Sequence, residues 1–136
     1  FAKGYYIRPT VFADVRPDHQ LFQEEVFGPV ISITRFETDD QAIALANTGD
    51  FGLGASIWSR DIARAHRLSR HICGGIIWLN DHHRNDPRSV WGGVKDSGFG
   101  KENGWDALRG YLSKKSVVIR TEPGYDDWFA GSNRYG

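Results

Sequence analysis

Cys73 is the only thiol in the sequence that can be considered as a nucleophile. It stands between Ile72 and Gly74, at the expected end of a helix and just before an apolar run, and only His71 beside it offers a cationic neighbour. A reactive cysteine needs an exposed, electropositive setting, whereas most unreactive cysteines are buried. We therefore expect Cys73 to be a buried structural residue.

Two adjacent histidines, His82 and His83, stand between Asp81 and Asp86 and suggest a metal site. Neighbouring side chains of an extended segment point in opposite directions, so such a pair rarely binds one ion together. A polar loop is the favoured interpretation, and we predict no metal centre.

The glycine-rich segment 91–104, WGGVKDSGFGKENG, raises the possibility of a phosphate cradle around Lys95. Neither the dinucleotide fingerprint nor the Walker pattern is present, so the glycines indicate only close backbone approach. Glu24 and Glu25 come shortly before Gly28 and Pro29. From residue type alone, we expect them to be a solvated pair of charges in a loop.

Composition narrows the function classes further. The 136 residues hold 17 Lys plus Arg and 17 Asp plus Glu, a balance that argues against a nucleic-acid partner. One cysteine excludes an internal disulfide, and no long apolar run predicts a membrane span, so we expect a cytoplasmic setting. There is no methionine and the chain opens at Phe1, from which we expect a piece of a longer protein.

The elements that must position these residues follow an alternating pattern. We expect strands at 5–12, 30–36, 53–58 and 76–79, a helix that begins at Thr38 with a capping box to Gln41, and a helix over 61–72 capped by Ser59. Strands that alternate with helices predict right-handed βαβ units in an α/β fold, with the last three of these strands in one parallel sheet. Such a sheet is part of a doubly wound, mostly parallel one.

The last third of the sequence has a different character. Residues 80–104 have little periodicity, so we expect a long loop there. A loop of this length usually has a functional role or contacts another part of a larger protein. A short helix is expected over 105–112. The apolar segment 114–121 then begins at Lys114, ends at Thr121 and predicts a strand without a partner in the chain. The tail, 122–136, carries Trp128, Phe129 and Tyr135 and fits either an ordered arm on a neighbouring subunit or a frayed end.

Five ordered segments together resemble the C-terminal part of the catalytic domain of the aldehyde dehydrogenase superfamily. They are GYYIRPTVF at 4–12, QEEVFGPV at 23–30, FGLGASIWSRDIARAHR at 51–67, GGIIWLND at 74–81 and WGGVKDSGFGKENG at 91–104. The resemblance implies oxidation of an aldehyde to a carboxylic acid with NAD or NADP. It divides the chain into catalytic-domain residues 1–112, an oligomerisation strand at 113–121 and the tail 122–136.

The resemblance assigns two cofactor-binding residues. In the family, the glutamate at the position of Glu25 binds the nicotinamide ribose hydroxyls, and a carboxylate suits this because it accepts two hydrogen bonds at once. The phenylalanine at the position of Phe27 packs near the nicotinamide ring.

The resemblance also places the aldehyde entrance after Asn80. It implies a substrate pocket with Trp91 in its wall and Asp81, His82, His83, Arg84 and Asn85 at its mouth. A tryptophan followed by two glycines is similar to betaine aldehyde dehydrogenases, whose aromatic wall holds a quaternary ammonium group. The two histidines and Arg84 make this mouth more cationic than a quaternary ammonium substrate favours, so the identity of the aldehyde is left open.

No catalytic residue is expected in this chain. The family's catalytic cysteine, general-base glutamate, oxyanion-hole asparagine and adenine-binding domain lie before the matched segment, and Cys73 does not align with the nucleophile. The resemblance implies a C-terminal fragment that is inactive alone. The alternative is a non-enzymatic assembly or binding module, a homo-oligomer that uses the final strand and tail.

Overall fold

The computed structural model describes residues 3–122 and 124. In these residues two parallel strand pairs, one short antiparallel pair and four helices make up the fold. The elements are β1 (Thr10–Phe12), α1 (Gln20–Gln23), β2 (Val30–Ser32), α2 (Asp39–Asn47), β3 (Phe51–Gly52), β4 (Gly54–Ile57), α3 (Ile62–Ser69), β5 (Ile76–Leu79), β6 (Val94–Lys95) and α4 (Gly104–Gly110). The α/β class expected from the sequence is confirmed.

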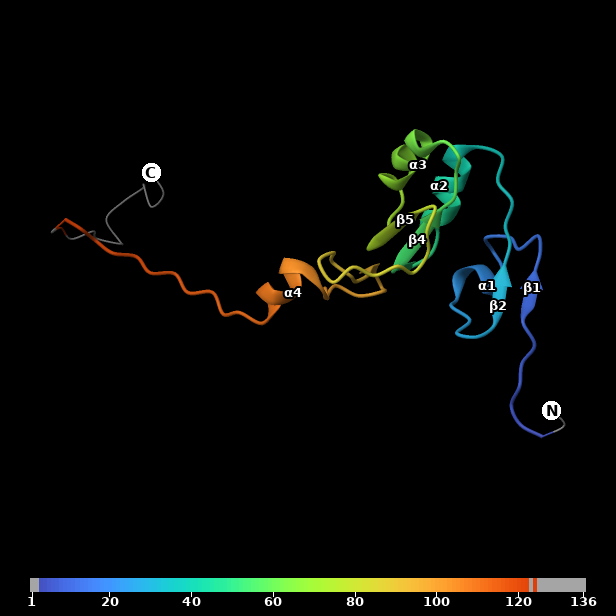
Figure 1. Cartoon of the computed structure of the whole chain (residues 1–136), viewed down its shortest axis with the longest axis horizontal. Helices are drawn as coiled ribbons and strands as arrows, with labels where there is room; N and C mark the ends of the chain where they lie inside the picture. The colour runs from blue at the N-terminus through green and yellow to red at the C-terminus, as the bar shows by residue number, and fades with distance from the viewer. Residues whose placement is uncertain (1–2, 123, 125–136) are drawn as a thin grey trace.

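The βαβ unit β4–α3–β5 is the best-formed part of the molecule. Strands β4 and β5 are parallel, with Gly54 opposite Ile76 and Ile57 opposite Leu79. Helices α2 and α3 lie side by side near this pair (Figure 1), and Arg64 of α3 is ion-paired with Asp39 of α2. Ala65 of α3 and Trp78 of β5 are two of the few buried apolar residues in the described part of the chain.

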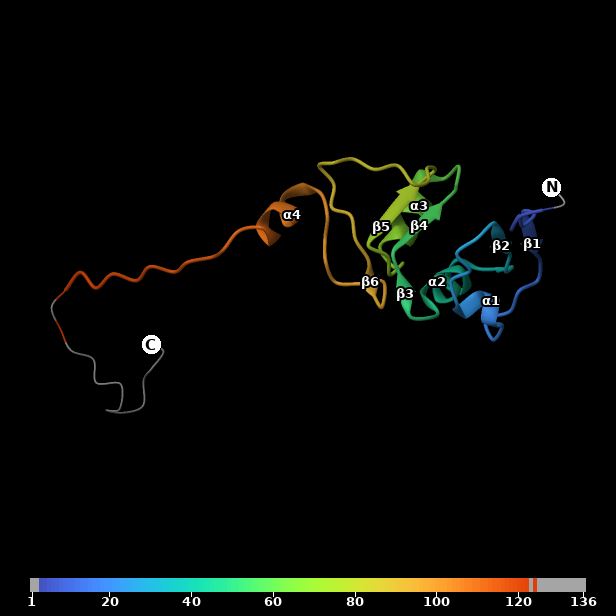
Figure 2. The same ribbon diagram turned by 90° about the horizontal axis from the view of Figure 1, so that it is seen from below.

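The sheet differs from the expected one in its strand pairing. The strand expected over 30–36 does not join β4 and β5; its paired part, β2, lies parallel to β1, with Thr10 opposite Val30. The pairing of β1 begins only at Thr10 because Pro9 has no N–H to donate. A third sheet pairs β3 with β6, antiparallel (Figure 2), and β6 lies inside the segment 80–104, for which little structure was expected.

The helices are shorter than the periodicity of the sequence predicted. Helix α2 has the expected cap, because the Thr38 side chain accepts a hydrogen bond from the Gln41 N–H. Helix α3 is capped by Asp61, whose carboxylate accepts from the Arg64 N–H at 2.9 Å, so the expectation of a Ser59 cap and a helix to Ile72 was wrong. Ser59 Oγ instead accepts from the Asp61 N–H.

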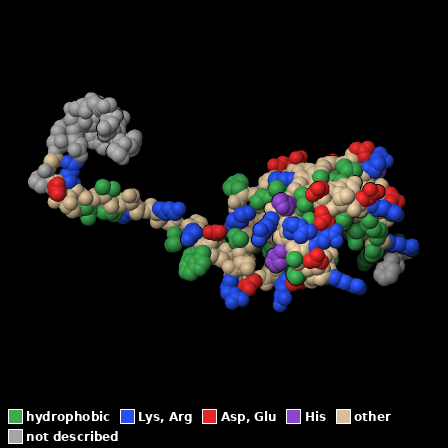
Figure 3. Space-filling view, turned by 90° about the horizontal axis from the view of Figure 1, so that it is seen from above, with side chains coloured by type: hydrophobic (Ala, Val, Ile, Leu, Met, Phe, Trp, Pro, Cys, Tyr) green, Lys and Arg blue, Asp and Glu red, His purple; other side chains and the backbone are tan. Residues whose placement is uncertain are grey.

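Beyond α4 the chain extends away from the body of the molecule (Figures 1 and 3). Residues 113–121 are extended and carry no strand pairing within the described part of the chain. The expected aromatic tail residues Trp128, Phe129 and Tyr135 lie outside the described residues. None of the helices in the described residues is long and apolar enough to cross a membrane.

Candidate functional site

A cavity of about 480 Å³ lies between α1 and β3, and we call it the α1–β3 cavity. Five stretches of chain line it: the end of α1 with the two residues that follow, one residue of α2, β3 with the start of β4, the turn before β5, and the turn after β6. Its lining residues are 22–25, Ala46, 51–55, Ile72, Cys73, Asp96 and Ser97. Three carboxylates and no lysine, arginine or histidine line it, so the cavity favours hydroxyl or cationic groups over phosphates.

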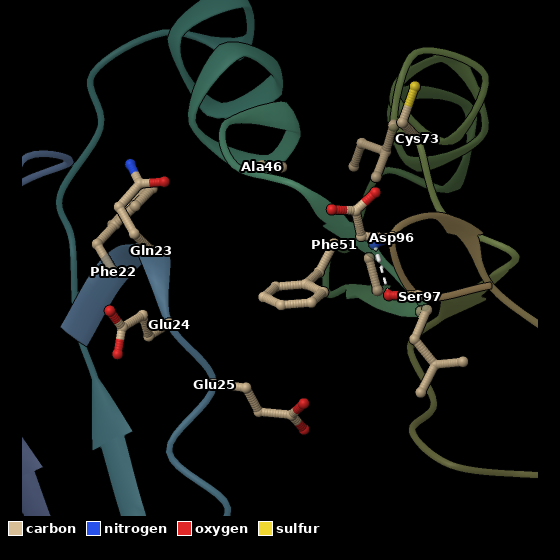
Figure 4. A pocket seen from close by; sticks show the side chains of 14 residues that line it. Phe22, Gln23, Glu24, Glu25, Ala46, Phe51, Cys73, Asp96 and Ser97 are labelled. Atoms are coloured by element: carbon tan, nitrogen blue, oxygen red, sulfur yellow. Dashed lines mark hydrogen bonds between the residues drawn. The ribbon is translucent and has the colours of Figure 1, made fainter. Parts of the chain in front are cut away.

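Glu24 and Glu25 are adjacent, but their carboxylates do different things. The Gln20 side-chain amide donates to Glu24 Oε2 at 2.8 Å, which directs Glu24 back onto α1. Figure 4 shows Glu25 extending from the loop toward the side where Phe51 and Ser97 lie. Within the described residues no hydrogen bond or ion pair of the Glu25 side chain is found, so its two oxygens are available as acceptors.

The opposite wall is fixed by a hydrogen bond between side chain and backbone. The Gly52 N–H donates to Ser97 Oγ at 3.0 Å, which joins β3 to the turn after β6 (Figure 4). Gly52 also lies close to its neighbours, since a Cβ placed there would lie 2.8 Å from the Cys73 carbonyl oxygen. The backbone of this wall is therefore closely packed at Gly52, while Phe51 and Ser97 contribute side chains to it (Figure 4).

Phe27 lies outside the α1–β3 cavity. It is 97% exposed, and only Val26 separates it from Glu25 in the sequence. The structure thus brings Glu25 into a cavity and leaves Phe27 on the surface.

Cys73 is exposed, which corrects the expectation of a buried cysteine. Helix α3 ends at Ser69, so Cys73 lies in the connection to β5 and not in a packed helical turn. Its backbone N–H is held by Asn47 Oδ1 at 2.7 Å, while Figure 4 shows the sulfur turned away from Glu25.

Four aromatic rings gather at the start of the loop that follows β5. Trp78 is 9% exposed and its ring contacts those of His82, His83 and Trp91, with ring centroids 5.6 to 6.3 Å apart. The His83 ring is also edge-on to Trp91 at 5.9 Å. Trp78 is the centre of this cluster, and it was not selected from the sequence because it lies within an apolar strand.

Trp78 also fixes the path of the loop. Its indole Nε1–H donates to the Arg84 carbonyl at 2.9 Å, and His82 Nδ1 lies 2.8 Å from Ser56 Oγ of β4. Both contacts tie the loop to the buried end of the parallel pair. A loop held in this way can present side chains in fixed positions.

A second cavity, of about 620 Å³, adjoins the two indoles, and we call it the tryptophan cavity. Of the residues predicted from the sequence, Trp91, Arg84 and Asn85 line it together, whereas Asp81, His82 and His83 do not. Its lining residues are Ile76, Ile77, Trp78, Arg84, Asn85, Asp86, Ser89, Val90 and Trp91.

The charges around this mouth are largely paired. Arg84 NH1 lies 3.6 Å from Asp81 Oδ2, and Arg88 NH2 lies 2.8 Å from Asp86 Oδ2. The Arg88 hydrogen bond lowers the pKa of the Asp86 carboxyl below its ordinary value. In the described residues no three His, Cys, Asp or Glu side chains are grouped as metal ligands would be.

Comparison with known proteins adds to this geometry. The sequence model of the aldehyde dehydrogenase family matches residues 1–117. The chain is 42% identical over 127 residues to peroxisomal aminoaldehyde dehydrogenase 1 of Pisum sativum, covering 93% of this chain and 25% of that protein. It is 38% identical over 126 residues to betaine aldehyde dehydrogenase of Bacillus subtilis, covering 93% of this chain and 26% of that protein.

Solved structures give the same result. The crystal structure of betaine aldehyde dehydrogenase from Staphylococcus aureus in complex with NAD⁺ matches with a TM-score of 0.86 at 38% identity, over 94% of this chain and 25% of that one. The chain therefore spans about a quarter of the length of the relatives it matches. With a family match over most of its residues and the same fold in a solved relative, the chain belongs to the aldehyde dehydrogenase family.

Proposed function

We propose that this chain forms the part of an NAD(P)-dependent aldehyde dehydrogenase that binds the nicotinamide ribose and shapes the aldehyde entrance. The bound nicotinamide supplies the hydride acceptor for oxidation of an aldehyde to a carboxylic acid. The residues present fit that role, since the α1–β3 cavity offers carboxylates for hydroxyl groups and no cation for phosphates. We also propose a cytoplasmic setting, in keeping with a single free thiol.

The difference between Glu25 and Glu24 is the observation that carries this proposal. Glu25 has no partner within the described residues and extends into the cavity, as a carboxylate that binds two ribose hydroxyls must. Phe27 lies two residues further along the chain, outside the cavity, and its exposed ring offers an apolar surface for the nicotinamide ring.

The tryptophan cavity fits the entrance for the aldehyde. Trp78 and Trp91 supply a flat apolar wall, and Arg84 and Asn85 supply polar groups at its edge. Asp81, His82 and His83 belong to the loop that forms the rim. The relatives are named for amino-, betaine and acetaldehydes, so their names do not select one substrate.

Nicotinamide mononucleotide tests the ribose site, because it carries the ribose hydroxyls without the adenosine. We expect Glu25→Gln to raise its Kd about tenfold, or about 1.4 kcal/mol, since a neutral amide replaces a charge-assisted acceptor. Glu24→Gln is the matched control and leaves the Kd unchanged. Isothermal titration calorimetry measures both variants, with free nicotinamide as a ligand that lacks the ribose.

Equal Kd values for the Glu25→Gln and Glu24→Gln variants would contradict the assignment. The same preparations are expected to give no aldehyde-dependent NADH, since Cys73 does not match the family nucleophile. Turnover that Cys73→Ala abolishes would show instead that the chain is catalytic alone.

A second role, as an assembly module, is favoured by the extended segment 113–121. The side chains of Val117, Val118 and Ile119 are 73%, 92% and 75% exposed, and the segment has no strand pairing in the described part of the chain. We propose that it adds a strand to a sheet of another copy of the chain.

A further inference from the structure

Asn47, the last residue of α2, makes hydrogen bonds through its side chain and its backbone carbonyl. Its side-chain amide donates to the His71 carbonyl at 2.7 Å, and its Oδ1 accepts from the Cys73 N–H at 2.7 Å. One side chain thus holds both ends of a three-residue turn that contains Ile72, and Ile72 and Cys73 line the α1–β3 cavity.

Lys95 reaches the same helix end from the opposite direction. Its Nζ donates to the Asn47 carbonyl at 2.8 Å and to the Gly49 carbonyl at 2.9 Å. A cation at a helix C-terminus satisfies carbonyls that have no partner in the helix and is favoured by the helix dipole. Lys95 adopts a φ of 54°, a conformation that costs a residue other than glycine free energy and that its contacts must offset.

The residues that follow Lys95 make hydrogen bonds of their own to the same region. The Asp96 N–H donates to the Asp50 carbonyl at 2.9 Å, and Ser97 Oγ accepts from the Gly52 N–H at 3.0 Å. Asp96, Ser97 and Gly52 all line the cavity. Hydrogen bonds therefore join the loop 47–50 to the turns at 71–73 and 95–97, which both contain residues that line the cavity.

This loop also lies against the side of the cavity that carries Glu25. A Cβ placed on Gly49 would lie 3.3 Å from Gln23 Oε1, so the end of α1 packs over the loop. Gly49 itself has a φ of 89°, which glycine alone adopts without strain. The α2 C-terminus is thus the common support of the wall segments and of the element that leads to Glu25.

We propose that Asn47 and Lys95 are positioning residues for the nicotinamide ribose site, and we call the pair the Asn47–Lys95 clamp. They do not touch the ribose; they fix the turn at 71–73 and the turn at 95–97, which together set the distance between Glu25 and the facing wall. The inference rests on the proposed function for its ligand, and on the hydrogen bonds alone for its mechanical part.

Hydrogen exchange measured by mass spectrometry tests the mechanical part without any ligand. Asn47→Ala and Lys95→Met are expected to raise amide exchange at least fivefold in peptides that cover 71–75 and 95–98, and to leave 10–15 and 30–34 unchanged. Lys101→Met is the matched control, since Lys101 Nζ donates to the Gly93 carbonyl in the same loop and Gly93 does not line the cavity. Exchange that rises uniformly along the chain, or not at all, would overturn the clamp.

Nicotinamide mononucleotide binding tests the functional part. Asn47→Ala and Lys95→Met are expected to raise its Kd about tenfold, and Lys95→Arg to restore most of the affinity because a guanidinium also donates to both carbonyls. Unchanged affinity in the two variants, with binding still dependent on Glu25, rejects the positioning role and keeps the proposed ribose site. If hydrogen exchange rises locally as expected but the unmodified chain does not bind nicotinamide mononucleotide, the clamp is kept and the ribose site is rejected.

Discussion

Asp39 shows how one side chain links two helices of this molecule. It lies in the first turn of α2, and Arg64 Nε of α3 donates to its two oxygens at 3.0 and 3.1 Å, while Arg67 NH2 lies 3.7 Å away. The hydrogen bond from Arg64 lowers the pKa of the Asp39 carboxyl below its ordinary value of 3.8, and the charge of Arg67 acts in the same direction.

The lowered pKa makes the contribution of Asp39 depend on pH. A carboxyl whose pKa is lower in the folded state stabilises that state above its unfolded pKa, and this contribution is lost as the pH falls through the folded value. We therefore expect Asp39→Asn to reduce the free energy of unfolding at pH 7, and the difference from the unmodified chain to shrink below pH 3.8. Urea unfolding at several pH values measures it.

Asp40→Asn is the control for this prediction. Asp40 is exposed in the same turn of α2, and no ion pair in the described residues joins it to Arg64 or Arg67. A pH-dependent difference of the same size in both variants would assign the effect to the helix dipole and not to the arginine contacts.

Residue type alone could not show which of the candidate residues are available to bind a ligand. The family resemblance selected Glu25, and the structure adds the reason that it, and not Glu24, is available: Gln20 lies one helical turn before Glu24 and bonds to it. Whether Glu25 binds ribose stays a prediction. The burial of Cys73 was predicted wrongly because exposure depends on where α3 ends, and periodicity places helix ends only approximately.

At the scale of elements, the start of α3 shows why the sequence pattern predicted the wrong N-cap residue. Both Ser59 and Asp61 are good N-cap residues by type, and the choice between them depends on which side chain reaches the free N–H groups of the first turn. Asp61 does so, through Arg64 N–H, while Ser59 is engaged with the Asp61 N–H.

We expect Asp61→Ala to lower the free energy of unfolding by about 1 kcal/mol, because a helix N–H then loses its acceptor. Ser59→Ala should cost less, since its hydroxyl bonds outside the helix. Urea unfolding followed by circular dichroism compares the two variants. A larger loss for Ser59→Ala would restore the cap that the sequence predicted.

The strands show which parts of the fold can be predicted from a short-range sequence pattern. Strands β4 and β5 were predictable because an apolar run, a helix and a second apolar run form a local unit. The pairing of β2 with β1 was not, since partner choice is set by long-range packing and both strands have the same period. The β3–β6 pair joins residues more than 40 positions apart through two-residue strands, which are too short for any alternation to be visible.

At the scale of the whole molecule, the chain buries little of its apolar surface. Its accessible area is 12302 Å², against roughly 7,100 Å² for a compact protein of this mass. Val15, Ala65 and Trp78 are the buried hydrophobic residues of the described part. We expect a chain with so small a core to gain stability when its exposed apolar segments are covered.

The segment 113–121 is where this idea can be tested most directly. Val118→Asp places a carboxylate on a side chain that is 92% exposed, so the isolated chain should keep its circular dichroism spectrum and its thermal midpoint. If the segment pairs with another copy, the new carboxylate is desolvated or repelled there, and the dimer Kd should rise at least tenfold. Sedimentation equilibrium measures the Kd, with Ser113→Asp at the edge of the segment as a control of equal charge. A strict monomer at every concentration of the unmodified chain would rule out self-assembly through this strand, whereas equal effects of the two substitutions would point to net charge alone.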